Sequence, residues 1–224
     1  MAHLAHESAE LAQLYNRRFN SHITYRNQIW KVLTEKFFSR FIDPGAVVLD
    51  LGCGYGEFSN HVRCAKKFAM DLNPTAQDYL VPDITFLQQD CSQPWDLAED
   101  SLDVVFTSNF FEHLPSRRSL ADTLGQARRC LRSGGRIIAM GPNSRYVGGA
   151  YWDFWDHHIA LTERSLVEVL EIEGFRIEKV IPRFLPYTMV NSRRYPMLLV
   201  SCYLAVPLAW RMMGKQFLVM ARKG

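Results

Sequence analysis

The pattern of apolar and polar positions changes near residue 46. From there, short apolar runs rich in β-branched and aromatic residues alternate with stretches in which apolar residues recur at helical spacing. This alternation is typical of a parallel sheet covered by helices. We expect strands at residues 46–51, 66–71, 84–90, 102–108, 135–141, 175–181 and 216–222. The sequence therefore predicts an α/β fold with seven strands.

Two crossovers between these strands carry helix signals. Apolar residues keep helical spacing from Leu120 to Leu131, and Gly134 follows as a stop. Before the sixth strand, Thr162 can cap a helix that ends near Gly174. Both signals place helices where a parallel sheet needs crossovers.

The length of 224 residues suits one domain over residues 1–224 with additions to its core. We expect a helical cover at residues 1–42, the alternating core at 43–182, an insertion at 183–215 and the last strand at 216–224. Such additions commonly cover a site, so substrate choice is expected to lie there. Tyr15, Arg18, Tyr25 and Arg26 could close over the site from the cover, but an exposed helix face is the favoured interpretation for each.

Composition argues against a disulfide scaffold, a cysteine zinc site and a secreted protein, and it indicates where the protein is located. An apolar content of 48% and a charged content of 22% are ordinary for a soluble globular protein. The five cysteines form no C-x-x-C pair and no even framework, which favours reduced thiols over disulfides or a zinc site. The first residues lack the basic start and apolar core of a signal peptide. We therefore expect a cytoplasmic protein.

The stretch "LDLGCGYGEF", residues 49–58, is the strongest local signal. A glycine turn between a strand and a helix most often holds a phosphate. Here Asp50 lies inside the turn and Glu57 follows it, and the spacing G-x-G-x-G differs from the dinucleotide spacing G-x-G-x-x-G. The carboxylates indicate a ligand that is not an anion, although a structural role for Asp50 is nearly as well supported.

Polar residues follow the first four strands and should meet at one edge of the sheet. Asp71 can accept hydrogen bonds from both hydroxyls of a ribose, and Asp90 can accept one from an exocyclic amine such as that of adenine. The candidate ligand-binding residues at this edge are Asp50, Gly52, Cys53 and Gly54, then Asp71, Leu72 and Asn73, then Asp90, Cys91 and Ser92, and finally Asn109 and Phe110.

Four segments together resemble the class I S-adenosylmethionine-dependent methyltransferases: "VVLDLGCGYGEF", "MDLNP", "QQDCSQPWDLAEDSLDVVFTSNFFEHLP" and "LRSGGRIIAMGPN". The resemblance implies a Rossmann-like, doubly wound sheet, mostly parallel with an antiparallel last strand. It implies S-adenosylmethionine as cofactor, with the glycine turn against its methionine part, Asp71 on the ribose, and Asp90 or Cys91 near adenine. A zwitterionic sulfonium ligand tolerates Asp50 where a pyrophosphate would not.

The acceptor is less well defined. The fourth strand is followed by "SNFF" and not by the D/N-P-P-Y turn of adenine-modifying relatives, so no nucleic-acid partner is expected. The segments "EHLP", "GPN" and "DHH…LT" look like those of small bacterial enzymes that methylate sugars, glycans or lipid-linked intermediates, and we expect O-methylation of such an acceptor. The alternatives are a small hydrophobic acceptor of the quinone or natural-product type, and a non-catalytic cofactor-binding partner protein.

A hydroxyl acceptor needs a base, and histidine suits that role. His113, His157 and His158 are the candidates, with a structural role favoured for His113 and at least one of the other two expected to face the acceptor. The surrounding "YWDFWDHH", residues 151–158, could be a pocket wall, a metal site or a packed turn. Adjacent histidines on a strand point opposite ways, so no metal site is predicted.

The insertion contains an apolar run between Tyr195 and Arg211, with Pro207 inside it. It falls short of the roughly 20 residues that span a bilayer. It is apolar around its whole circumference, so it must be buried under the sheet edge, in a second copy of the chain or in lipid. No acidic residue follows Glu178, whereas eight basic ones do. We favour a lid that rests on the anionic inner membrane and admits a lipid-linked acceptor, with burial in the core or in a homodimer as alternatives.

Overall fold

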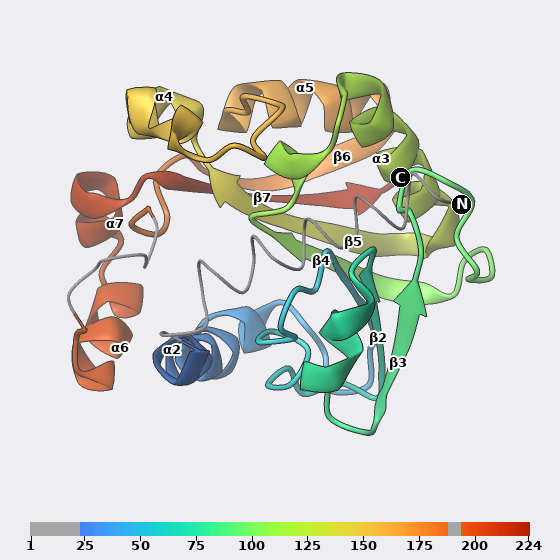
Figure 1. Cartoon of the computed structure of the whole chain (residues 1–224), viewed down its shortest axis with the longest axis horizontal. Coiled ribbons are helices and arrows are strands. Elements are labelled where there is room, and N and C mark those ends of the chain that lie inside the picture. The colour runs from blue at the N-terminus through green and yellow to red at the C-terminus, as the bar shows by residue number, and fades with distance from the viewer. Residues whose placement is uncertain (1–22, 188–193) are drawn as a thin grey trace.

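The computed structural model describes residues 23–187 and 194–224. They form a seven-stranded sheet in the order β3-β2-β1-β4-β5-β7-β6 (Figure 1). The last strand pairs antiparallel with both of its neighbours, and the other neighbouring strands are parallel. The strands are β1 (Val47–Leu51), β2 (Lys66–Asp71), β3 (Ile84–Gln88), β4 (Leu102–Ser108), β5 (Leu131–Pro142), β6 (Phe175–Ile181) and β7 (Gln216–Lys223). The Rossmann-like fold expected from the sequence is confirmed.

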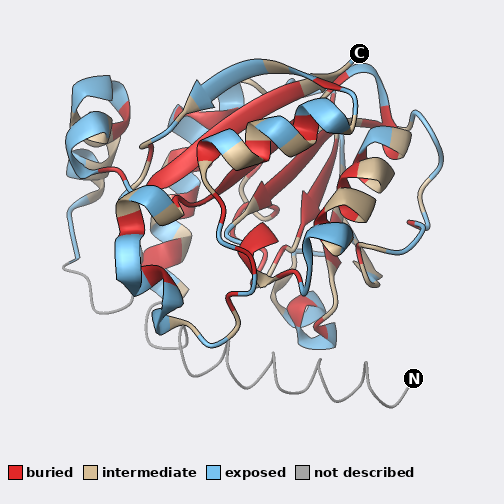
Figure 2. Cartoon of the chain, turned by 90° about the horizontal axis from the view of Figure 1, so that it is seen from above, coloured by how far each residue is buried: buried red, intermediate tan, exposed pale blue. Residues whose placement is uncertain are grey.

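Side chains alternate between the two faces of the sheet, and each face has its own apolar core. Leu49 and Val105 face the core under α3 (Arg117–Cys130) and α5 (Glu163–Ile172). Val48 and Phe106 face the core under α2 (Ile23–Lys36), η2 (Phe38–Arg40) and α6 (Met197–Ala205). Figure 2 shows the buried strands between helices that keep an exposed outer face. The near-continuous apolar strands follow from burial on both sides.

The two predicted crossover helices are present, with one difference at an end. Thr162 caps α5 through a capping box with Ser165. Helix α3 ends at Cys130 and does not include Leu131, because Leu131 pairs with Leu102 and begins β5. Helical spacing alone could not detect this strand contact.

The glycine turn after β1 is not followed by a regular helix. Residues 57–61 form only a turn before β2 begins at Lys66. The other strand ends carry short elements: η3 (Pro74–Tyr79) after β2, η4 (Phe111–His113) after β4, and α4 (Ser144–Val147) with η5 (Gly148–Asp153) after β5. The site edge is therefore built mainly from turns held by the sheet.

The insertion between β6 and β7 forms two short helices, α6 and α7 (Pro207–Met213), and Pro207 begins the second. Within the described residues, every helix is too short or too polar to cross a membrane. Leu204 is buried in the core beside α2, whereas Leu198, Leu208 and Met212 are exposed. The apolar circumference expected from the sequence is thus covered by the chain on one side only.

Candidate active site

A cavity of about 630 Å³ runs from the glycine turn to the insertion helices. Gly52, Cys53 and Asn109 line one end, and Leu199 and Val206 line the other. Most of its wall is apolar, with aromatic side chains from α2, β4 and the turn after β1. Its size and lining are those of a small-molecule site at the carboxyl ends of the strands of an α/β sheet.

Close packing and backbone hydrogen bonds fix the conformation of the glycine turn. Gly52 has φ +70°, and a Cβ there would lie 2.3 Å from the ring of Phe110. The backbone N–H groups of Gly52 and Cys53 both donate to the carbonyl of Met70 on β2. A side chain at residue 52 would displace Phe110, so glycine is required at this position.

Asp71 fixes the turn from the end of β2. One carboxylate oxygen accepts from the N–H of Gly54 at 2.9 Å and the other accepts from the N–H of Asn73 at 2.9 Å. Burial raises the pKa of Asp71, and these backbone hydrogen bonds oppose the rise. Each oxygen keeps a second lone pair, so the carboxylate can still accept from a ribose.

The residues after β3 divide between the site edge and the core. Asp90 accepts hydrogen bonds from the N–H and the hydroxyl of Ser92. The Cys91 thiol lies in the core against Thr123, where burial raises its pKa to about 12. Of Cys91, therefore, only the backbone can approach a ligand at this strand end, because its side chain lies in the core.

Two buried carboxylates lie beside the glycine turn, as the sequence suggested. Asp50 accepts from the hydroxyl of Ser59, and burial raises its pKa to about 7. Glu57 pairs with Arg26 of α2, with 2.9 Å between Nε and Oε1. Both side chains of this ion pair are buried and line the cavity.

The expectation of an exposed α2 face was wrong for two residues. Tyr25 and Arg26 are both buried, because α2 packs between the sheet and α6. The Tyr25 hydroxyl accepts from the N–H of Tyr195 at 2.6 Å, which joins α2 to the insertion. Tyr15 and Arg18 lie outside the described residues.

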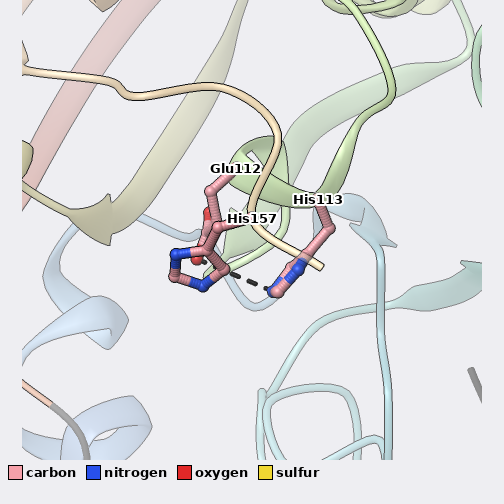
Figure 3. Close-up of side chains that lie close together, drawn as sticks. All are labelled: Glu112, His113 and His157. Atoms are coloured by element: carbon pink, nitrogen blue, oxygen red, sulfur yellow. Dashed lines mark ion pairs between the residues drawn. The ribbon is translucent and has the colours of Figure 1, made fainter. Parts of the chain in front are cut away.

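Glu112, His113 and His157 converge on the cavity between the glycine turn and the apolar end (Figure 3). Glu112 and His113 come from η4, and His157 comes from the loop after η5. Nε2 of His113 lies 3.9 Å from Oε1 of Glu112. The two histidines were expected from the sequence, whereas Glu112 was not, although it lies in the quoted "EHLP" segment.

Asp156 orients His113 from behind. Nδ1 of His113 lies 2.9 Å from the carbonyl of Asp156 and 3.2 Å from its carboxylate. Both atoms are acceptors, so Nδ1 carries the proton and Nε2 is turned toward Glu112 and the cavity. Figure 3 shows this approach of His113 and Glu112.

The electrostatics of the group favour positive charge beside Glu112. Burial lowers the pKa of His113, but the hydrogen bond to Asp156 and the charges of Glu112 and Asp156 outweigh it and raise the pKa. Burial raises the pKa of Glu112 to about 7, and His113 opposes the rise. Both pKa values are therefore raised, which favours retention of protons on the pair of Glu112 and His113.

The other two polar residues of the 151–158 segment face elsewhere. His158 has an exposed side chain that does not line the cavity, and its backbone N–H donates to the carbonyl of Glu112. Asp153 is also exposed. His157 stacks on Phe154 at 5.1 Å and meets the edge of Tyr151. Of the two adjacent histidines, His157 is the one at the cavity.

The donor set at the strand ends fits S-adenosylmethionine. Carboxylates that suit an ammonium and a sulfonium lie on either side of the glycine turn, Asp50 on β1 before it and Glu57 after it. The carboxylate of Asp71 keeps lone pairs for a ribose. A pyrophosphate would meet the buried carboxylates of Asp50 and Glu57 and would be repelled. The chemistry of the edge matches the expectation from the sequence, while the contact of each named residue with the cofactor stays a prediction.

Residues 49–139 match the model of a family described as a methyltransferase domain. No curated protein matches the sequence. Many solved structures share the fold, including these three. An S-adenosylmethionine-dependent methyltransferase from Archaeoglobus fulgidus is 19% identical with a TM-score of 0.65, covering 88% of this chain and 94% of the other. A methyltransferase in complex with the Trm112 activator from Haloferax volcanii is 16% identical with a TM-score of 0.64, covering 92% and 93%. The [4+2]-cyclase SpnF is 18% identical with a TM-score of 0.60, covering 88% and 80%.

The family match and the fold together support S-adenosylmethionine-dependent methyltransferase activity, with S-adenosylmethionine as the cofactor. The match runs from within β1 to within β5, and this part carries the glycine turn, Asp71, Asp90 and Glu112. The insertion that lines the other end of the cavity lies outside the matched residues.

Proposed function

We propose, from the premise that residues 49–139 form an S-adenosylmethionine-dependent methyltransferase domain, that the protein O-methylates an acceptor with a long apolar part, in the first instance a lipid-linked sugar or glycan. The supporting observation is the single cavity, which joins the glycine turn to the apolar insertion helices. A free sugar would leave most of this apolar wall without a partner.

The cofactor supplies a methyl group on a sulfonium, whose positive charge is lost on transfer. The residues of the chain align the acceptor and remove water, which is the main contribution open to an enzyme for such a displacement. Asp50 in its ionised form would stabilise positive charge at the glycine turn, whereas the charge of Glu57 is compensated by Arg26. As the methyl carbon–sulfur bond broke to leave a neutral thioether, the acceptor oxygen would form the new bond to that carbon. Its hydroxyl proton would pass to the group of Glu112, His113 and His157. Asp156 holds His113 in the tautomer that accepts a proton at Nε2.

The proton-accepting role is tested with His113→Ala and His158→Ala. Loss of His113 should lower turnover by about a hundredfold or more while the affinity for S-adenosylmethionine holds. The exposed His158 serves as the matched control and should keep full turnover. Calorimetry of cofactor binding separates the two effects. Full activity in His113→Ala would remove this residue from the reaction.

The acceptor class is tested with labelled S-adenosylmethionine and four acceptor sets: polyprenyl-linked sugars, glycolipids, hydroxylated quinone precursors and nucleotide sugars. Transfer to the first two sets supports the proposal. Transfer to quinone precursors would support the alternative of a small hydrophobic acceptor. Transfer to nucleotide sugars alone would contradict an apolar acceptor, and cofactor binding without transfer to any set would favour a non-catalytic partner protein.

We further propose that the insertion rests on an anionic membrane, from which the acceptor enters. Leu208 and Met212 are 64% and 72% exposed, and Trp155 of the loop after η5 is 87% exposed. The exposed Arg211 lies between Leu208 and Met212 in the sequence, and the exposed Lys215 follows them. Each basic residue is worth about 1 kcal/mol near anionic lipid. In Figure 1 the insertion helices and the α4–η5 segment lie toward the same end of the molecule.

Liposome co-sedimentation tests this contact. Binding should rise with the anionic lipid fraction and fall with salt, and Leu208→Ser with Met212→Ser should reduce it. Val81→Ser, an exposed apolar position before β3, is the control. Protein that stays in the supernatant with every lipid composition, together with a dimer in analytical ultracentrifugation, would favour a homodimer through residues 183–215 instead.

A further inference from the structure

The three side chains at the centre of the cavity have the composition of a transition-metal site. One ligand atom from each of Glu112, His113 and His157 can be chosen so that all three lie within 4.8 Å of one another. Two imidazoles and one carboxylate with an open position are typical of catalytic zinc and of related divalent ions. Here all three residues line the cavity, so the open position would face the space proposed for the acceptor.

The second feature is the support behind His113. A metal-bound histidine commonly donates its other N–H to a carboxylate or a carbonyl, which fixes the ring and the tautomer. Nδ1 of His113 lies within hydrogen-bond distance of both kinds of acceptor on Asp156, and this leaves Nε2 as the ligand atom on the cavity side. Asp156 thus accepts the Nδ1–H of His113, as the partner of a metal-bound histidine commonly does.

The third feature is the charge around Glu112. Its side chain is almost fully buried, and its ion pair among the described residues is with His113. Arg26 is the only lysine or arginine among the described residues that line the cavity, and it pairs with Glu57. Buried carboxylates require a cation or a proton close by. A divalent cation between Glu112 and the two imidazoles would provide that charge.

We propose that Glu112, His113 and His157 bind one divalent transition-metal cation of the zinc class, with an open coordination position facing the acceptor cavity. The distance of 3.9 Å between Nε2 of His113 and Oε1 of Glu112 is close to that between two ligand atoms on one ion. Only a small movement of the two side chains toward each other is needed. The role of the cation rests on the proposed function and changes one step of it. With Nε2 of His113 bound to the cation, the cation would bind the acceptor oxygen and lower the pKa of its hydroxyl, and the proton would pass to solvent instead of to these side chains. The binding itself does not depend on that function.

The test uses the full chain, freed of metal with a chelator and titrated with Co²⁺ and Zn²⁺. We expect one equivalent of Co²⁺ to give the visible absorption of a four- or five-coordinate ion with nitrogen ligands, and Zn²⁺ to displace it. Glu112→Gln and His157→Ala should each weaken binding by about a hundredfold or more, and Asp156→Asn by about tenfold. His158→Ala, next to the site but exposed, should bind as the wild type does.

Circular dichroism of each variant separates loss of a ligand from loss of the fold, and His157→Ala replaces Glu112→Gln if the latter does not fold. Absence of binding in the wild type, or binding that Glu112→Gln and His157→Ala leave unchanged, would overturn the metal site. Methyl transfer at full rate after chelation would overturn the role of the cation and leave the proposed function intact. Metal binding by a protein that transfers methyl groups to no acceptor would support the metal site and contradict the proposed function.

Discussion

The two ends of the cavity are built in different ways. At the glycine turn, backbone N–H groups, buried carboxylates and a required glycine fix each position, as with Asp71 and the N–H of Gly54. At α6 and α7, apolar side chains line the cavity on one side and are exposed on the other, and the main polar links are to α2 and to the chain near Phe184. With the proposed placement of cofactor and acceptor, the difference predicts that cofactor binding depends on fixed geometry, while acceptor binding depends on apolar area that many ligands could use.

The largest effect in this comparison is expected when a side chain is introduced at residue 52. Gly52→Val should abolish cofactor binding and destabilise the fold by roughly 2 to 4 kcal/mol, because it combines a positive φ with overlap onto Phe110. Gly149→Val is the control, since a Cβ there meets nothing within 4 Å. Urea unfolding and calorimetry would measure both effects. Equal behaviour of the two variants would mean that the turn is not fixed by packing.

The second prediction concerns pH and the buried carboxylate of Asp50. Its pKa rises from 3.8 to about 7 on folding, so the folded state holds a proton that the unfolded state releases. The contribution of Asp50 to stability is therefore complete below about pH 4 and is lost as the pH rises toward 7, by roughly 2 to 4 kcal/mol in total. Denaturant unfolding over this range should show a smaller fall in Asp50→Asn. An identical slope in variant and wild type would show that the carboxylate is already ionised in the folded protein.

The third prediction concerns the end of β2. Asp71→Ala should weaken S-adenosylmethionine by about 2 kcal/mol or more, because it removes a carboxylate acceptor and also frees the N–H of Gly54. Asp78→Ala on η3 is an exposed carboxylate control. Calorimetry gives the result directly, and unchanged affinity in Asp71→Ala would refute this assignment.

The smallest effect is expected at the other end of the cavity. Leu208→Ser on α7 should change the free energy of unfolding by less than about 0.5 kcal/mol and leave cofactor affinity unchanged, because the side chain is largely exposed. Thermal unfolding with and without S-adenosylmethionine would measure it. A loss of stability similar to that of a core substitution would show that the insertion is as tightly built as the glycine turn.

The same contrast explains what could be predicted from the sequence. All seven strands were found because each is a short β-rich run, and the residues after four of them could be placed at one edge because parallel strands end together. The end of α3 was misplaced because Leu131 pairs with Leu102, a contact that helical spacing does not contain.

The centre of the site was harder to predict. The role of Glu112 and the burial of Arg26 depend on which distant segments meet, and neither has a local signal. His157 and His158 are adjacent in the sequence, and only the packing of His157 on Phe154 separates the one at the cavity from the one in solvent. The two exposed aromatic residues Trp152 and Trp155 likewise could not be told from core aromatics by residue type.

The position of β7 between β5 and the edge strand β6 has a consequence for how the chain folds. Strand β6 has β7 as its neighbour in the sheet, although β7 is separated from it in sequence by the whole insertion. During synthesis β6 must therefore wait until residues 216–223 have emerged before it can join the sheet. Closing so long a connection is a slow step in folding, and it leaves β6 and the apolar insertion exposed together in the meantime. The segment proposed to meet lipid in the folded protein is thus also the one for which a chaperone or an early membrane contact would matter most before folding is complete.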